Sequence, residues 1–327
     1  MIRILHPERF QGHGQRPPYF EGWYYKLVDA TERHRYAIIP GITLNPGSEG
    51  PHSFVQVLDG VTGATAYHVY PLADFHAAPD MFDVRIGPNR FTQRGLTLNL
   101  PSGDLALRAH TIFRKPQPWP VTLTAPGIMG WFGWLPWMEC YHGVVSLDHA
   151  IIGEIAVGDA AIDFTGGRGY IEKDWGRSFP SAWVWMQSNH FRRPGTSLVA
   201  SVARIPWLGH SFRGFIVGLL HRGTLYRFAT YTGAKLEALD ITPAAVQLTL
   251  TDRLYRLDIT AHRPPPAATG ALRGPNRTDM RTRVLESLSA RISARLTARQ
   301  SGAEIFAGEG RHAGLEVGGD LPALLRR

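Results

Sequence analysis

"TRVLESLSARISARLTARQ", residues 282–300, decides whether the chain is all-β or mixed. Val284, Leu288, Ile292 and Leu296 recur at every fourth position, a spacing that fits one face of a helix. The same residues also lie on a period of two, because alanines fill the gaps between them and serines and arginines take the opposite parity. Glu286 departs from this alternation. Since strand alternation accounts for more positions than the helical period, we predict a strand.

Most of the chain carries the same signature of short apolar-polar alternations punctuated by glycine and proline. Examples are "SFVQVLDG" at 53–60 and "VQLTLTDRLYRLDITAH" at 246–262. Residues 98–107 predict a hairpin with a turn over 101–104. Consecutive hairpins build barrels or sandwiches, so the sequence predicts an all-β fold.

The length of 327 residues favours two domains. Residues 263–280, "RPPPAATGALRGPNRTDM", have no periodicity and are predicted to form a long connecting loop. Tyr19-Phe20-Glu21 and Tyr170-Ile171-Glu172 repeat a Tyr-x-Glu pattern that a tryptophan soon follows. Two related halves would explain this echo, and so would chance.

Charge and motif content exclude several functional classes. The net charge of +8 comes from arginines spread along the chain, so we predict no nucleic-acid partner, although anionic lipid surfaces fit the balance. The one cysteine, Cys140, allows no internal disulfide and no cysteine-based zinc site. Scattered histidines and the lack of a dinucleotide motif predict neither a metal nor a cofactor. No signal peptide is evident, and a cytoplasmic location is expected.

The longest uncharged stretch is "PQPWPVTLTAPGIMGWFGWLPWM", residues 116–138. Its prolines and glycines make a membrane-spanning helix unfavourable. We expect chain that is buried in protein or lies at an interface, since tryptophan favours the edge of lipid.

Three stretches combine acids with aromatic side chains. In "PPYFEGWYYKL", residues 17–27, strand alternation places Glu21 on one face with Tyr19, Trp23 and Tyr25. A carboxyl among aromatic rings has its charged form disfavoured, so Glu21 is a candidate general acid. A structural glutamate that hydrogen-bonds to neighbouring backbone is the alternative.

In "WMECYHGVV", residues 137–145, Glu139 shares a face with Tyr141, and Cys140 shares the other with His142. Cys140 is either a thiol nucleophile or, as is more usual, a small buried apolar residue. His142 is either a donor that faces a ligand or a core histidine.

The third stretch is "GYIEKDWGRSFPSAWVWMQ", residues 169–187. A strand would place Tyr170, Glu172 and Asp174 on one face, with Lys173 and Trp175 on the other. After a turn at 176–180, a second strand would align one row of side chains: Trp183, Trp185, Gln187 and Asn189. This pattern is typical of a ligand cavity with apolar walls and few polar groups, although a salt-bridged corner is the alternative.

These stretches, together with "PGIMGWFGWLPWMECYHGVVSL" at 126–147 and "AGLEVGG" at 313–319, resemble the tocopherol cyclase family. The resemblance implies two lipocalin-like (calycin-type) antiparallel β-barrel halves packed together, which we place at residues 1–163 and 164–327. It also implies protonation of a prenyl double bond beside a quinol ring, followed by attack of the phenol oxygen to close a chromanol ring, without a cofactor. We expect no plastid transit segment and therefore a bacterial-type relative.

This chemistry fits the residues, because a neutral carboxyl in an apolar pocket can protonate an alkene and aromatic faces stabilise the resulting cation. We rank Glu172 and Asp174 first as the acid, then Glu21, then Glu139, and expect Lys173 either to act in catalysis or to pair with one of them. The predicted substrate contacts are Trp23, Tyr25, Glu139, His142, Trp175, Trp183, Trp185, Gln187 and Asn189. The alternatives are a hydratase or cyclase of another isoprenoid, or a carrier of a hydrophobic ligand. Such a ligand resides in lipid, so peripheral membrane contact is expected.

Overall fold

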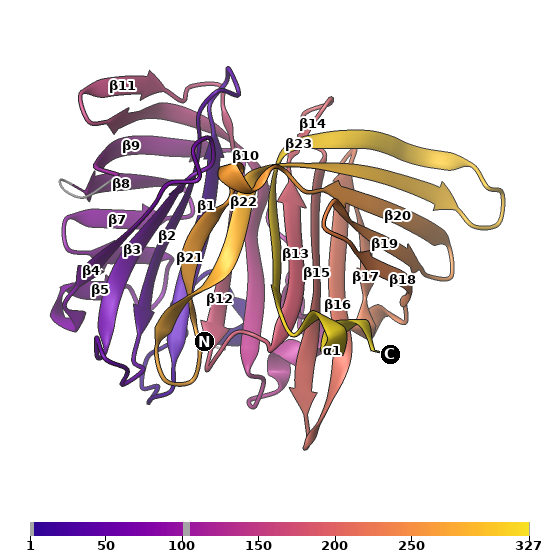
Figure 1. Ribbon diagram of the computed structural model, residues 1–327, viewed down its shortest axis with the longest axis horizontal. Helices are drawn as coiled ribbons and strands as arrows, with labels where there is room; N and C mark the ends of the chain where they lie inside the picture. The colour runs from indigo at the N-terminus through magenta and orange to yellow at the C-terminus, as the bar shows by residue number, and fades with distance from the viewer. Residues whose placement is uncertain (1–2, 101–104, 327) are drawn as a thin grey trace. The chain divides into compact units, whose positions relative to one another are not determined.

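The computed structural model describes residues 3–100 and 105–326, and nearly all of its regular structure is β-strand (Figure 1). The all-β prediction is therefore confirmed. The chain forms two compact units. Unit 1 consists of Met1–Phe179 and Gly270–Arg283, and unit 2 consists of Pro180–Thr269 and Val284–Arg327.

Unit 1 is built on an antiparallel sheet with the strand order β4-β3-β2-β1-β12-β10-β9-β8-β7-β6-β5, and β11 pairs with β10. Its strands are β1 (Phe20–Val28), β2 (Arg35–Thr43), β3 (His52–Asp59), β4 (Thr65–Tyr70), β5 (Phe75–Ala77), β6 (Asp83–Ile86), β7 (Asn89–Thr92), β8 (Gly95–Leu100), β9 (Leu107–Arg114), β10 (Cys140–Val157), β11 (Ala160–Asp163) and β12 (Arg168–Gly176). Short 3-10 helices accompany them: η1 (Arg3–Leu5), η2 (Leu72–Asp74) and η3 (Gly130–Trp134).

Unit 2 is built on a second antiparallel sheet, ordered β17-β16-β15-β13-β23-β22-β20-β19-β18, and β14 pairs with β23. Its strands are β13 (Ala182–Ser188), β14 (His190–Phe191), β15 (Ser197–Trp207), β16 (His210–His221), β17 (Thr224–Ala229), β18 (Lys235–Ile241), β19 (Ala245–Thr251), β20 (Tyr255–His262), β22 (Met280–Ala298) and β23 (Glu304–Gly319). The helical pieces are η4 (Thr230–Thr232), η5 (Pro266–Ala268) and α1 (Leu321–Leu325).

Each unit has its own apolar core, formed by one face of its sheet. In β9 of unit 1 the buried residues Leu107, Ala109 and Phe113 alternate with exposed ones, which is the period of a half-buried strand. In β13 of unit 2, Ala182, Val184 and Met186 belong to the core. The alternation of apolar and polar residues in the sequence thus predicts which side chains belong to each core.

The opening stretch of the sequence is confirmed as a strand, β22. The exception at Glu286 has a structural cause, because the register with β23 shifts between Ser287 and Ala290. Such a bulge places one extra residue in a strand and reverses which face later side chains take. Glu286 therefore lies opposite Glu316 of β23, and Ser287 lies opposite the core residue Leu315.

Two boundary expectations differ from the structure. Residues 263–280 are not one long loop, because β21 (Gly270–Pro275) pairs with β22 and Gln56 of β3 hydrogen-bonds both ways with the backbone of Arg273. The prolines and glycines of this stretch interrupt the alternation that would predict a strand. The division expected at residue 163 also differs from the compact units, since β12 belongs to the sheet of unit 1.

The hairpin predicted over 98–107 is seen as the antiparallel pair β8 and β9, and its turn at 101–104 lies outside the described residues. Across the part of the chain that the structure describes, no helix combines the length and apolar character needed to cross a bilayer.

Candidate functional site

Strand β12 is central to unit 1, because it pairs with β1 on one side and β10 on the other. His142 of β10 lies directly opposite Asp174 of β12, and Val144 lies opposite Glu172. Residues that face one another across antiparallel strands project from the same face of the sheet. His142 therefore lies on the same face of the sheet as the predicted group Tyr170, Glu172 and Asp174. Ile171 projects from the other face, into the core.

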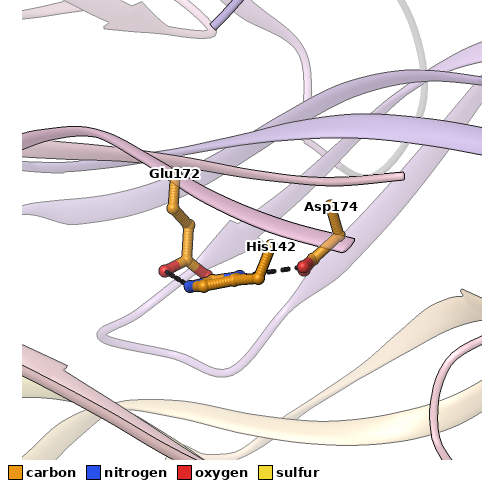
Figure 2. Close-up of side chains that lie close together, drawn as sticks. All are labelled: His142, Glu172 and Asp174. Atoms are coloured by element: carbon orange, nitrogen blue, oxygen red, sulfur yellow. Dashed lines mark hydrogen bonds and ion pairs between the residues drawn. The ribbon is translucent and has the colours of Figure 1, made fainter. Parts of the chain in front are cut away.

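The imidazole of His142 lies between the two carboxylates (Figure 2). Its Nδ1 atom is 2.8 Å from Oδ1 of Asp174, and its Nε2 atom is 3.5 Å from Oε2 of Glu172. The hydroxyl of Tyr170 donates to Oε2 of Glu172 over 2.5 Å. Four titratable side chains from two adjacent strands therefore form one polar group, which is partly exposed at His142 and Asp174.

The electrostatics of this group favour an imidazolium. Burial lowers the pKa of His142, but the charges of Glu172 and Asp174 and the hydrogen bond to Asp174 outweigh it and raise the pKa to about 9. Burial and the nearby Glu172 carboxylate also hold the pKa of the Tyr170 hydroxyl well above its usual value. At neutral pH both ring nitrogens of His142 thus carry protons, and Tyr170 remains a donor.

The exposed fractions of the Asp174, His142 and Glu172 side chains differ. The side chain of Asp174 is 28% exposed, that of His142 12% and that of Glu172 6%. Asp174 is therefore the carboxyl that a substrate can reach, and Glu172 lies behind the imidazole. Sequence alternation grouped the two acids but could not rank them, because exposure depends on the neighbouring strands.

Glu21 and Lys173 form a separate ion pair on the other face of the same strands. Oε1 of Glu21 is 2.6 Å from Nζ of Lys173, and both side chains are fully buried. Glu21 also accepts hydrogen bonds from the hydroxyl of Tyr19 and the backbone N–H of Gln11. Burial lowers the pKa of Lys173, and Glu21 opposes this effect.

This ion pair indicates a structural role for both residues. Besides Glu21, the ammonium of Lys173 donates to the carbonyl oxygens of Pro7 and Arg9 and lies 4.9 Å and 4.7 Å from the ring centroids of Trp23 and Trp175. Glu21 thus has three partners, the Lys173 ammonium, the Tyr19 hydroxyl and the backbone N–H of Gln11. The alternatives given for both residues are therefore observed, because Lys173 pairs with one of the acids and Glu21 accepts a hydrogen bond from backbone. The pair fixes the N-terminal segment on the sheet, and a catalytic role for either residue stays a prediction.

Two predicted substrate contacts are core residues of unit 1. Trp23 and Tyr25 are fully buried, and Trp23 stacks on Phe82 while its Nε1–H donates to the carbonyl of Glu8. The hydroxyl of Tyr25 donates to the carbonyl of Thr92. Both side chains are thus packed in the core, and their contact with a substrate stays a prediction.

Trp175 lies on the same core-side face and stacks on Tyr141 with a centroid distance of 5.4 Å. Its indole covers Lys173. Trp175 and the acids Glu172 and Asp174 therefore project from opposite faces of β12, as alternation predicted.

The remaining aromatic and amide candidates belong to unit 2. Ala182, Val184 and Met186 face the core of this unit. The residues that alternate with them project from the opposite face of β13: Trp183, Trp185 and Gln187. The indole N–H of Trp183 donates to Oε2 of Glu316 over 2.8 Å. Asn189 follows the end of β13 and contacts Nδ1 of His190 through its Oδ1 atom at 3.0 Å.

Neither Glu139 nor Cys140 has the surroundings of a catalytic group. Glu139 forms an ion pair with Arg277 over 2.9 Å. Burial, together with Asp174 and Glu139, raises the pKa of the Cys140 thiol well above its ordinary value. A thiol kept protonated is a poor nucleophile, so the apolar reading of Cys140 is favoured.

Among the described residues, His142, Glu172 and Asp174 also form a group whose ligand atoms lie within 4.8 Å of one another, close enough for a metal ion. The two carboxylates approach different ring nitrogens, however. Both ring nitrogens therefore have a carboxylate neighbour, an arrangement in which a proton can move within the group.

The Tyr-x-Glu echo has a local explanation. In both copies the tyrosine hydroxyl donates to the glutamate two residues later, Tyr19 to Glu21 and Tyr170 to Glu172. Side chains at i and i+2 share a face of a strand, which makes this contact easy to form. Both copies lie in unit 1, on the adjacent strands β1 and β12 or at their ends, so the echo does not mark two halves.

Solved structures share this fold. A putative AttH from Nitrosomonas europaea aligns with a TM-score of 0.55 at 15% identity over 92% of each chain. CghA with Sch210972 aligns with a TM-score of 0.56 at 9% identity, over 93% of this chain and 89% of CghA. Kievitone hydratase from Nectria haematococca aligns with a TM-score of 0.50 at 11% identity, over 93% and 91%. The fold is thus that of the AttH and CghA structures.

The matches by sequence cover a smaller part of the chain than the structural alignments do. A tocopherol cyclase-like family model matches residues 115–319, so the chain belongs to the tocopherol cyclase-like family. A probable chloroplastic tocopherol cyclase of Oryza sativa subsp. japonica is 27% identical over 127 residues, 38% of this chain and 27% of that protein. The chloroplastic tocopherol cyclase of Zea mays is 28% identical over 110 residues, 32% and 23%. These matches span about a quarter of the plant proteins.

Proposed function

We propose that this protein protonates a carbon–carbon double bond of an isoprenoid substrate and directs an oxygen nucleophile onto the resulting cation. A prenyl quinol is the proposed substrate, with a chromanol as the product. The observation that carries the proposal is the buried imidazole of His142 between Asp174 and Glu172. Membership of the tocopherol cyclase-like family supports it.

Asp174 is the proposed proton donor. It is the most exposed member of the group, and the proton that it would donate is the one that lies between Nδ1 of His142 and Oδ1 of Asp174, two atoms 2.8 Å apart. Movement of this proton from the imidazolium to the carboxylate gives a neutral pair in which Asp174 carries the proton, and the proton then passes from Asp174 to the alkene. Glu172 holds His142 charged and fixes its orientation from the other side.

The proposed reaction balances without an external reagent. The carboxyl proton of Asp174 adds to the less substituted alkene carbon, and the alkene electron pair forms the new C–H bond. The tertiary carbon then carries the positive charge, and a phenol oxygen of the same molecule bonds to it. The phenol proton returns to the carboxylate of Asp174, so the protein is regenerated.

A hydratase would differ only in the nucleophile, because water would replace the phenol oxygen. One structural neighbour is named kievitone hydratase, which makes hydration a specific alternative product to examine. Both reactions place a solvent-derived hydrogen on carbon.

The test is incubation with a prenyl quinol in detergent in D₂O, followed by mass analysis. A ring-closed product with the mass of the substrate plus one carbon-bound deuterium supports cyclisation, and a product heavier by one water indicates hydration. Asp174→Asn, which keeps size and polarity, is the matched control and is expected to bind the quinol without converting it. Recovery of unchanged quinol from the unmodified protein that binds it would overturn the proposal in favour of a carrier.

A further inference from the structure

Residues 116–138 of unit 1 present a group of apolar side chains to solvent. This segment contains no charged residue. Five of its large apolar side chains are between 38% and 70% exposed: Val121, Leu123, Trp131, Trp134 and Trp137. Single exposed apolar residues are ordinary, but a contiguous group marks an interaction site.

The contacts within the segment bring several of these side chains together. Trp131 and Trp134 are three residues apart in the 3-10 helix η3, which has three residues per turn, so they project from the same side. The indole N–H of Trp134 donates to the carbonyl of Leu123 over 3.0 Å, which places Leu123 beside it. We call the five exposed residues the tryptophan patch.

The patch is held on a fixed support. Trp119, Ile128, Met129 and Met138 of the same segment are buried. Gly133 lies against Pro126, because a Cβ atom there would be 2.9 Å from the Pro126 ring. The buried anchors occupy the interior of the unit, and the exposed indoles remain available for a partner.

Basic side chains flank the patch. Arg114 and Lys115, both exposed, come directly before the segment. After it, the backbone N–H of Arg177 donates to the carbonyl of Glu139, and Arg277 pairs with the Glu139 carboxylate. Arg3 is next to Ile4, which lies close to Gly133. Arg277 is paired with Glu139, so the exposed Arg114 and Lys115 leave positive charge at the start of the segment.

We propose that the tryptophan patch docks this protein on an anionic lipid surface. Tryptophan favours the boundary between acyl chains and headgroups, and exposed lysines and arginines attract anionic headgroups. The five prolines of the segment restrict it to the interface, because they exclude a spanning helix. The inference is independent of the proposed function, since it concerns where the protein resides rather than what it converts.

The test is co-sedimentation of the full chain with phosphatidylcholine vesicles, with and without phosphatidylglycerol. Binding is expected to rise with the anionic lipid and to fall with added salt. Leu123→Ser with Trp137→Ser is expected to weaken binding by roughly tenfold for each side chain. Arg114→Gln with Lys115→Gln is expected to weaken binding only to anionic vesicles, by about fivefold for each charge.

The matched control is Leu208→Ser with Leu254→Ser, two exposed leucines of unit 2. This variant also replaces two exposed large apolar side chains with serine and is expected to bind vesicles as the unmodified protein does. Equal loss in the control and in the patch variant would overturn the proposal. So would lipid-free self-association that only the patch variant abolishes, because the patch would then bind a second copy of the chain.

Discussion

Nδ1 of His142 lies 2.8 Å from Oδ1 of Asp174, across the β10–β12 pair. The same ring contacts Glu172 through its other nitrogen. One imidazole thus couples an accessible carboxyl to a buried one, although the two acids lie two residues apart on one strand.

We expect Asp174→Asn to lower turnover by about a thousandfold, because it removes the proton that is transferred. Glu172→Gln keeps the donor but releases His142 from its second carboxylate, so a smaller loss, of about tenfold to a hundredfold, is expected. Steady-state rates of quinol conversion check this order, with quinol binding as the control. A larger loss in Glu172→Gln would assign the donor role to Glu172.

The pH dependence follows from the raised pKa of His142. A group whose folded-state pKa exceeds its ordinary value of 6.5 stabilises the fold fully below pH 6.5, and this contribution disappears as pH rises toward about 9. The stability difference between the unmodified protein and His142→Gln should therefore shrink between pH 6.5 and 9. Urea denaturation midpoints at several pH values measure it, and a difference that grows over this range would contradict the imidazolium.

Alternation of residues made the fold class and part of the site predictable from sequence. Strand parity alone placed Tyr170, Glu172 and Asp174 together and Lys173 on the other face, and the structure confirms both placements. It could not say which strand would lie beside β12. His142 joins the acids because β10 pairs in this register, and that pairing depends on contacts far apart in sequence.

Two interpretations from the sequence did not take a neighbouring segment into account. Glu21 looked like an acid in an apolar pocket because its partner, Lys173, lies about 150 residues away in sequence and meets it only through the β1–β12 pair. Trp23 resembled a cavity wall for the same reason, since Phe82 covers it from another strand connection. The residue pattern of one strand predicts which side chains share a face of the sheet. Whether that face is exposed or covered by other side chains depends on the neighbouring strands.

The buried Glu21–Lys173 pair leads to a prediction about stability. Glu21→Gln leaves the Lys173 ammonium buried without its counter-charge, which is expected to cost about 3–5 kcal/mol. Adding Lys173→Met removes the charge and replaces it with an apolar side chain of similar length, so the double variant should recover most of the loss. Denaturation of both variants tests this coupling, and additive losses would show that the two residues act separately.

Gly169 provides a test of the packing around β12. A Cβ atom at this position would lie 2.2 Å from Nε2 of His149, which is buried, hydrogen-bonded to Ser146 and opposite Gly169 in β10. Gly169→Ala is therefore expected to destabilise the protein by about 1–3 kcal/mol through overpacking. His149→Ala removes the clashing ring, so the double variant should be more stable than the sum of the two single losses predicts.

The matched control for this cycle is Gly166→Ala with His149→Ala. A Cβ atom at Gly166 would come no closer than 3.5 Å to its nearest neighbour, Ala30, although its positive φ adds backbone strain. The two control losses should add, because Gly166 gains no contact with the histidine ring. Additive losses for Gly169 as well would mean that the glycine is required by its backbone and not by the imidazole that lies against it.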